Sequence, residues 1–179
     1  MTDFEASAFS DSPRKKKDRR AQYKWLTIIG ISLAAILFRV YVPRFFAFLS
    51  YLQLPLLVTV YFALMRRSPV AGVLFGAGIG LAEDSLSANP LGMYGIVKTL
   101  VGYFAATVSQ RFDVERGLVR GVLALFFYIF HQFFYWVLAR ALLGQPASFV
   151  PPVELVLAVL NAAVAVPLYH LLDKLKVSE

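Results

Sequence analysis

Four ionisable side chains interrupt apolar stretches of the sequence and are the first candidates for chemistry: Glu83, Asp84, Lys98 and His131. Two neighbouring carboxylates can act as a general acid and a general base. Adjacent positions on a helix point in different directions, however, so Glu83 and Asp84 are poorly placed for that task. The second histidine, His170, is remote from His131, and the sequence has no HExxH, nucleophile-elbow or phosphate-loop motif. We therefore predict a protein that is not an enzyme and uses no cofactor and no metal ion.

The apolar stretches that hold these side chains are long enough to cross a membrane. The chain is 59% hydrophobic and 16% charged, and its mean hydropathy is +0.65. A helix of about 20 apolar residues spans the hydrocarbon layer, which is roughly 30 Å thick. We predict an all-α integral membrane protein, a single bundle (residues 25–173) of six transmembrane helices at about 25–42, 45–65, 70–86, 91–108, 119–143 and 153–172.

The distribution of cations predicts how this bundle is oriented. A basic run from Arg14 to Arg20 precedes the first span, and most other Lys and Arg residues between spans fall on the same side. Positive residues accumulate in cytoplasmic segments, so both termini are predicted to be cytoplasmic. Residues 1–24 are expected to form a disordered basic tail and residues 174–179 a second tail. The basic run fits this topology and contact with anionic lipid, and we expect no nucleic-acid partner.

The third span is the most informative, because its apolar part is too short for the bilayer. Extending it to residue 86 brings Glu83 and Asp84 to the outer edge of the membrane, where a carboxylate needs a partner. Lys98 lies about two turns into the next span, too deep to reach the surface. We predict a buried contact between Lys98 and one of the two carboxylates. His131 is expected to make one interhelical hydrogen bond.

Glycines recur every fourth residue in the third span, at Gly72, Gly76 and Gly80. One face of this helix therefore lacks side chains, and another helix can approach its backbone closely. The approaching helix could belong to the same bundle or to a partner. After this span, Asn89 is expected to cap the next helix and Pro90 to occupy its first position. Asn161 and Pro167 mark the last span as locally irregular.

The stretch from Tyr51 to Phe112 resembles the bacterial rod shape-determining protein MreD, most specifically over residues 61–92. The resemblance rests on Tyr-Phe-Ala-Leu at 61–64, Arg-Arg-Ser-Pro at 66–69, and above all Gly-Leu-Ala-Glu-Asp-Ser-Leu-Ser-Ala-Asn-Pro-Leu-Gly at 80–92. The Gly-x-x-x-Asp spacing followed by Pro-Leu-Gly is the hallmark of that family. The sequence departs from the family at the start of the second span, where Pro55 lies further in and is followed by Leu56.

The resemblance implies a non-enzymatic scaffold of the cell-elongation machinery in the bacterial cytoplasmic (inner) membrane. It also implies the partners MreC, RodA and a class B penicillin-binding transpeptidase, with an indirect link to MreB filaments and peptidoglycan synthesis. The fold would be similar to that of the substrate-binding subunits of energy-coupling-factor transporters. MreC would bind through its single membrane anchor at the glycine face or the outer hairpin; we name Gly72, Gly76, Gly80, Asp84, Pro90 and Gly92.

Two other classes of function are open to a small helical bundle. A substrate-capture subunit of a vitamin-type transporter would use Tyr94, Lys98 and His131 as polar contacts in a central cavity. Its first span would normally carry an Ala-x-x-x-Ala docking pattern, but Ala34 is followed four residues later by Phe38. A membrane enzyme acting on lipid-linked precursors has no supporting motif.

Overall fold

The structure is a computed structural model that describes residues 25–87, 90–144 and 149–175. These residues form helices and no strand. The predicted tail at 1–24, Asn89 and the last four residues lie outside the described part of the chain. The helices are α1 (Trp25–Tyr41), η1 (Val42–Arg44), η2 (Ala47–Tyr51), α2 (Leu54–Arg66), α3 (Pro69–Leu86), α4 (Met93–Val108), α5 (Gly117–Leu143) and α6 (Pro151–Asp173).

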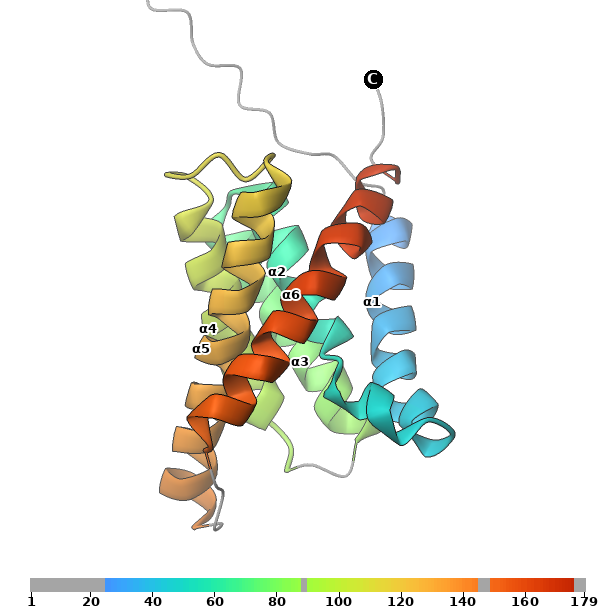
Figure 1. The fold of residues 1–179 in the computed structure, drawn as a ribbon, viewed down its shortest axis with the longest axis vertical. Helices are drawn as coiled ribbons and strands as arrows, with labels where there is room; N and C mark the ends of the chain where they lie inside the picture. Colours follow the sequence, from blue (N-terminus) through green and yellow to red (C-terminus); the bar gives the residue numbers. More distant parts are fainter. Residues whose placement is uncertain (1–24, 88–89, 145–148, 176–179) are drawn as a thin grey trace, which may run out of the picture.

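Helix α2 is the centre of the bundle. Every residue from Pro55 to Met65 is buried, and α2 contacts α1, α3, α4, α5 and α6. The other helices surround it, and α6 crosses the bundle obliquely in front of it (Figure 1). Their outer faces carry exposed Leu, Ile, Val and Phe side chains, as expected for helices surrounded by lipid.

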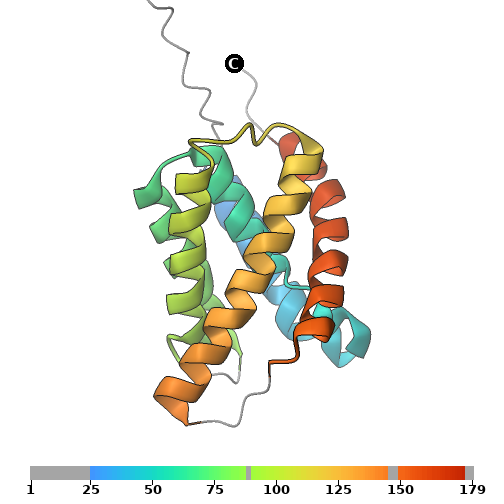
Figure 2. The same ribbon diagram turned by 60° about the vertical axis from the view of Figure 1, so that its left-hand side comes forward.

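Four stretches of the described chain are long and apolar enough to cross a membrane: Leu26–Arg44, Ala47–Arg66, Gly117–Leu143 and Pro151–Asp173. Helix α4 is apolar but shorter, and α3 ends in the two carboxylates. Helices α3 and α4 lie against each other from Gly72 and Gly102 to Gly80 and Gly95, and no other pair of described helices is in such extensive contact. Figure 2 shows α3 and α4 side by side next to the long α5.

The second predicted span differs from the structure. Residues 45–65 do not form one continuous α-helix, because a 3-10 helix (η2) precedes α2 and the chain is extended at Leu52. Pro55 lacks an N–H group and has a fixed φ, so it is favoured in the first turn of a helix, and α2 begins there. Helices α1, α3, α4, α5 and α6 have bounds close to the other five predicted ranges, and the crossing of a membrane by all six stays a prediction.

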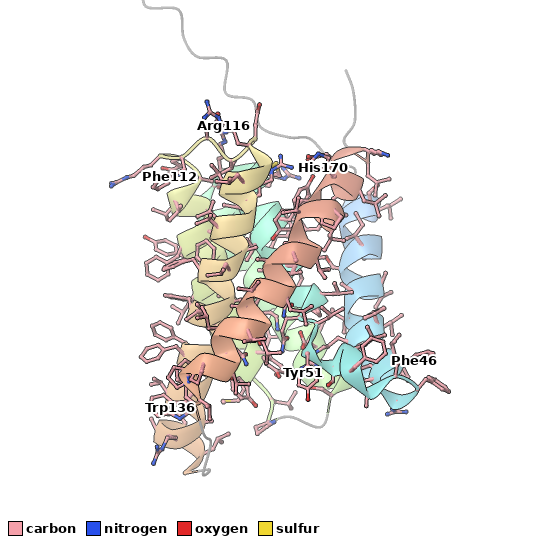
Figure 3. The ribbon with its side chains drawn as sticks, in the orientation of Figure 1. Phe46, Tyr51, Phe112, Arg116, Trp136 and His170 are labelled. Atoms are coloured by element: carbon pink, nitrogen blue, oxygen red, sulfur yellow. The ribbon has the colours of Figure 1, made fainter. Side chains whose placement is uncertain are left out.

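The two ends of the bundle differ in charge. Figure 3 shows Phe112, Arg116 and His170 at one end, and Phe46, Tyr51 and Trp136 at the other. We call the first the basic end, because the described cations Arg66, Arg67, Arg111, Arg116, Arg120 and Lys174 belong to it. The second is the hairpin end, where α3 turns into α4; it carries Arg39, Arg44 and Arg140.

Candidate functional site

Asp84 caps the start of α4. Its carboxylate accepts hydrogen bonds from the backbone N–H groups of Gly92 (3.0 Å), Tyr94 (3.1 Å) and Gly95 (2.9 Å). A helix leaves its first N–H groups without internal partners, and its dipole favours a negative charge at that end. Asp84 is only 1% exposed, so these three bonds satisfy a carboxylate that water does not reach.

The turn before α4 is shaped to bring these N–H groups together. Gly92 has φ +95°, a left-handed conformation that glycine adopts readily. The carbonyl of Pro90 accepts the N–H of Met93 at 3.3 Å. The sequence predicted Pro90 at the first position of the helix. In the structure Pro90 lies in the turn before α4, which begins at Met93. The Gly-x-x-x-Asp and Pro-Leu-Gly pattern thus has a structural meaning, since it joins two helices through one carboxylate.

Glu83 makes the predicted contact with Lys98. The Lys98 Nζ atom lies 2.7 Å from Glu83 Oε2, and both side chains are essentially inaccessible, at 0% and 1% exposure. The same ammonium lies 4.1 Å from the centre of the Tyr94 ring, which adds a cation–π contact. We call Glu83, Asp84, Tyr94 and Lys98 the α3–α4 polar cluster.

A second group of polar side chains continues from this cluster into α5 and α6. The Tyr94 ring stacks on His131 and on Tyr135, with centroids 5.7 and 5.1 Å apart. His131 Nδ1 lies 3.1 Å from the side-chain oxygen of its neighbour Gln132, so this contact is made within α5 and is not the interhelical bond that was predicted. Gln132 supplies that link instead, because its amide donates to Glu154 on α6 at 3.3 Å.

The glycine row faces α4 of the same chain. A Cβ atom added at Gly76 would lie 2.6 Å from the carbonyl carbon of Lys98, and one added at Gly80 would lie 2.7 Å from the Cα atom of Gly95. Gly72 meets Gly102 in the same way, with 2.8 Å to its carbonyl carbon. Since α4 covers the whole row, the glycines have no surface left for direct contact with a partner's helix.

Asn161 has a role that its position in α6 did not reveal. Its side-chain oxygen accepts the Gln53 N–H at 2.8 Å, and its amide donates to the carbonyls of Tyr51 and Leu157 at 2.9 Å each. The first two partners belong to the irregular segment before α2. Backbone groups outside a helix must find partners in a membrane, and Asn161 supplies them.

The basic end is held by an ion pair that sequence reasoning missed. Arg120 on α5 pairs with Asp173 at the end of α6, and its Nε donates to the carbonyl of Val114 at 2.6 Å. Tyr61 on the central helix donates to the same Asp173 at 2.7 Å. The sequence contained an indication of this pair, because Arg120 precedes the fifth apolar run and Asp173 follows the sixth.

The arrangement resembles a structural joint more than a reaction centre. The carboxylates of Glu83 and Asp84 are engaged by an ammonium and by backbone N–H groups. Lys98 and His131, which would line the cavity of a transport subunit, are 0% exposed and packed around Tyr94. Among the described residues, no group of three or more His, Asp or Glu side chains could hold a metal ion.

Comparison with known proteins agrees with the resemblance noted in residues 61–92. Neither a curated protein nor a solved structure gives a significant match, so the likeness to transporter subunits stays a prediction. The family model of the rod shape-determining protein MreD matches residues 19–176, nearly the whole chain. The match includes all six α-helices and the hairpin described above. This multi-pass membrane protein therefore belongs to the MreD family.

Proposed function

We propose that the chain is a non-enzymatic membrane scaffold of the bacterial elongation machinery. In this role it binds MreC and helps to couple MreB filaments to peptidoglycan synthesis by RodA and a class B penicillin-binding transpeptidase. Family membership supports a role in cell shape. The observation that supports a scaffold role is that Glu83, Asp84 and Lys98 all make contacts that hold α4 against α3. These charged side chains are therefore engaged in structural contacts and not in catalysis.

The scaffold is proposed to lie in the inner membrane with six spans. Helices α3 and α4 then cross as a pair beside the four longer stretches. The basic end faces the cytoplasm, because it holds most of the described Lys and Arg residues. The hairpin end then faces the outside, where the soluble part of a single-span partner with an inside N-terminus would begin.

The proposed contact for MreC is the surface of the hairpin at residues 90–92. Leu91 is 77% exposed at its tip, whereas Pro90 and Gly92 set the shape of the turn. Asp84 holds this turn by its bonds to the backbone N–H groups. The glycine row contributes indirectly, because it fixes the distance between α3 and α4.

The test is recovery of MreC with variants of two equally exposed leucines. Leu91 (77%) lies at the hairpin end and Leu118 (80%) at the basic end. We expect Leu91→Ser to lower co-purified MreC roughly tenfold, about 1.4 kcal/mol of binding, and Leu118→Ser to leave it unchanged. Equal recovery from both variants would show that the hairpin does not bind MreC.

A further inference from the structure

An apolar groove lies between α1 and α3 on the outside of the bundle. It encloses about 330 Å³ and is lined on α1 by Ile28, Leu33 and Ile36, and on α3 by Leu74, Gly78 and Ile79. Gly78 is the open point in its wall, since a Cβ atom there would meet nothing within 4 Å. Gly78 belongs to the opposite side of α3 from the glycine row that packs on α4.

A second cavity follows on the same two helices at the hairpin end. It encloses about 260 Å³, and its walls include Arg39 and Arg44 together with Glu83, Ser87 and Tyr94. The residues of α1 and α3 that line it come one turn after those that line the apolar groove. An elongated molecule lying along α1 and α3 would pass from a hydrocarbon environment into a polar one.

This second cavity has an excess of positive charge. Its one carboxylate, Glu83, is already paired with Lys98. Arg39 donates to the carbonyl of Ser50 at 2.5 Å, and Arg44 lies 5.2 Å from the Tyr41 ring centre. Within the described part of the chain, neither arginine has a carboxylate within ion-pair distance. Guanidinium groups bind phosphate through paired hydrogen bonds, so this charge is suited to a phosphate-bearing ligand.

The course of the apolar groove into the second cavity favours a phospholipid over a partner's helix. The groove is lined by apolar side chains of α1 and α3, and the cavity that follows it holds Arg39 and Arg44. A phospholipid carries a hydrocarbon chain and a phosphate in this same order. An acyl chain is thinner than a helix and flexible, and it can fill a groove that continues for several turns along α1 and α3.

We propose that α1 and α3 bind an anionic phospholipid. Its acyl chain lies in the groove along Ile36, Gly78 and Ile79, and its phosphate accepts hydrogen bonds from Arg39 and Arg44. The lipid lies against the side of the α3–α4 polar cluster that faces the second cavity, since Glu83 and Tyr94 also line this cavity. The site is separate from the proposed MreC contact at residues 90–92.

The test is native mass spectrometry of the full chain released from nanodiscs. Phosphatidylglycerol and phosphatidylcholine with identical acyl chains are compared as probes. We expect preferential retention of phosphatidylglycerol, and a loss of roughly tenfold in the Arg39→Gln, Arg44→Gln double variant. Arg140→Gln is the control, because Arg140 is an exposed cation at the same end and lies over the Trp136 ring. Arg44→Gln alone alters an exposed side chain, so its effect is measured on a folded protein.

A second pair of variants tests the groove itself. Gly78→Leu fills the groove and should reduce retention of phosphatidylglycerol, whereas Gly30→Leu adds the same bulk to open space on α1 and should not. Equal retention of both lipids, or equal retention by the double variant and Arg140→Gln, would overturn the proposal. If the double variant keeps the lipid but loses MreC, the cavity binds a partner's helix and the lipid site is wrong.

Discussion

Glu83 and Asp84 are adjacent in the sequence but do different work. Glu83 contacts the ammonium of Lys98, the sixth residue of α4, whereas Asp84 accepts hydrogen bonds from the backbone N–H groups at the start of α4. Successive side chains on a helix point about 100° apart, which allows two neighbouring carboxylates to have different partners. Glu83 is thereby neutralised by a counter-charge and Asp84 is stabilised by hydrogen bonds, at a depth where water is scarce.

The ion pair predicts a strong effect from removing one partner. Lys98→Met leaves the Glu83 carboxylate buried without its counter-charge, and this should cost about 3–5 kcal/mol of unfolding free energy. The double variant Glu83→Gln, Lys98→Met removes both charges and should recover most of that loss. Thermal unfolding in detergent measures both changes. If Lys98→Met unfolds at the same temperature as the unaltered protein, the pair contributes nothing to stability.

Some of these residue roles followed from the sequence and some did not. A lysine two turns inside a span needs a carboxylate, so the contact of Lys98 was predictable. The sequence did not predict whether Glu83 or Asp84 would pair with Lys98, because both carboxylates lie within reach of its flexible side chain. The capping role of Asp84 depends on backbone groups eight to eleven positions away and on the turn at Gly92. The cavity lined by Arg39 and Arg44 was not predictable, because these cations near the end of the first span are equally consistent with a role in topology alone.

At the scale of elements, the contact between α3 and α4 depends on the absence of side chains. Three glycines on α3 let the backbone of α4 approach so closely that no Cβ atom fits between them. The repeat of four residues predicted this close approach. The repeat did not predict which helix would pack on the glycines, since the same spacing suits a helix of the bundle and a helix of a partner.

A single methyl group on this face should therefore disturb the pair. Gly76→Ala places a Cβ atom 2.6 Å from the carbonyl carbon of Lys98, so the helices must move apart, at a cost of about 1–3 kcal/mol. Gly78→Ala on the other face meets open space and is the matched control. Thermal unfolding should show a lower midpoint for Gly76→Ala alone. Similar midpoints for the two variants would contradict the close packing.

The break before α2 shows why element boundaries were harder to predict. Hydropathy alone gives one apolar run from residue 45 to residue 65, and the position of Pro55 within this run did not by itself predict a break. What makes an interruption tolerable is Asn161, which is more than 100 residues away and supplies partners for the backbone at Tyr51 and Gln53. A pattern within one segment contains no information about such a partner.

At the scale of the whole molecule, the orientation can be tested cleanly because the chain has no cysteine. Phe46 and Phe112 lie at opposite ends of the bundle and are equally exposed, at 56% and 57% (Figure 3). With the basic end in the cytoplasm, a membrane-impermeant maleimide should label Phe46→Cys in spheroplasts. Phe112→Cys should react only after the membrane is opened. The reverse pattern would show that the orientation is inverted.

The dependence of α3 and α4 on each other extends to how the chain is made. Neither helix is among the four stretches that are long and apolar enough to cross by themselves. A lone lysine at mid-membrane costs about 2.5–3.5 kcal/mol during insertion, and the two carboxylates add to the difficulty for α3. Once α3 and α4 pack together, Lys98 and Glu83 neutralise each other, and the Asp84 carboxylate is bound by backbone N–H groups of α4 and of the turn before it. We therefore expect α3 to remain at the translocon until the ribosome has delivered α4, so that the two helices partition into lipid as one unit.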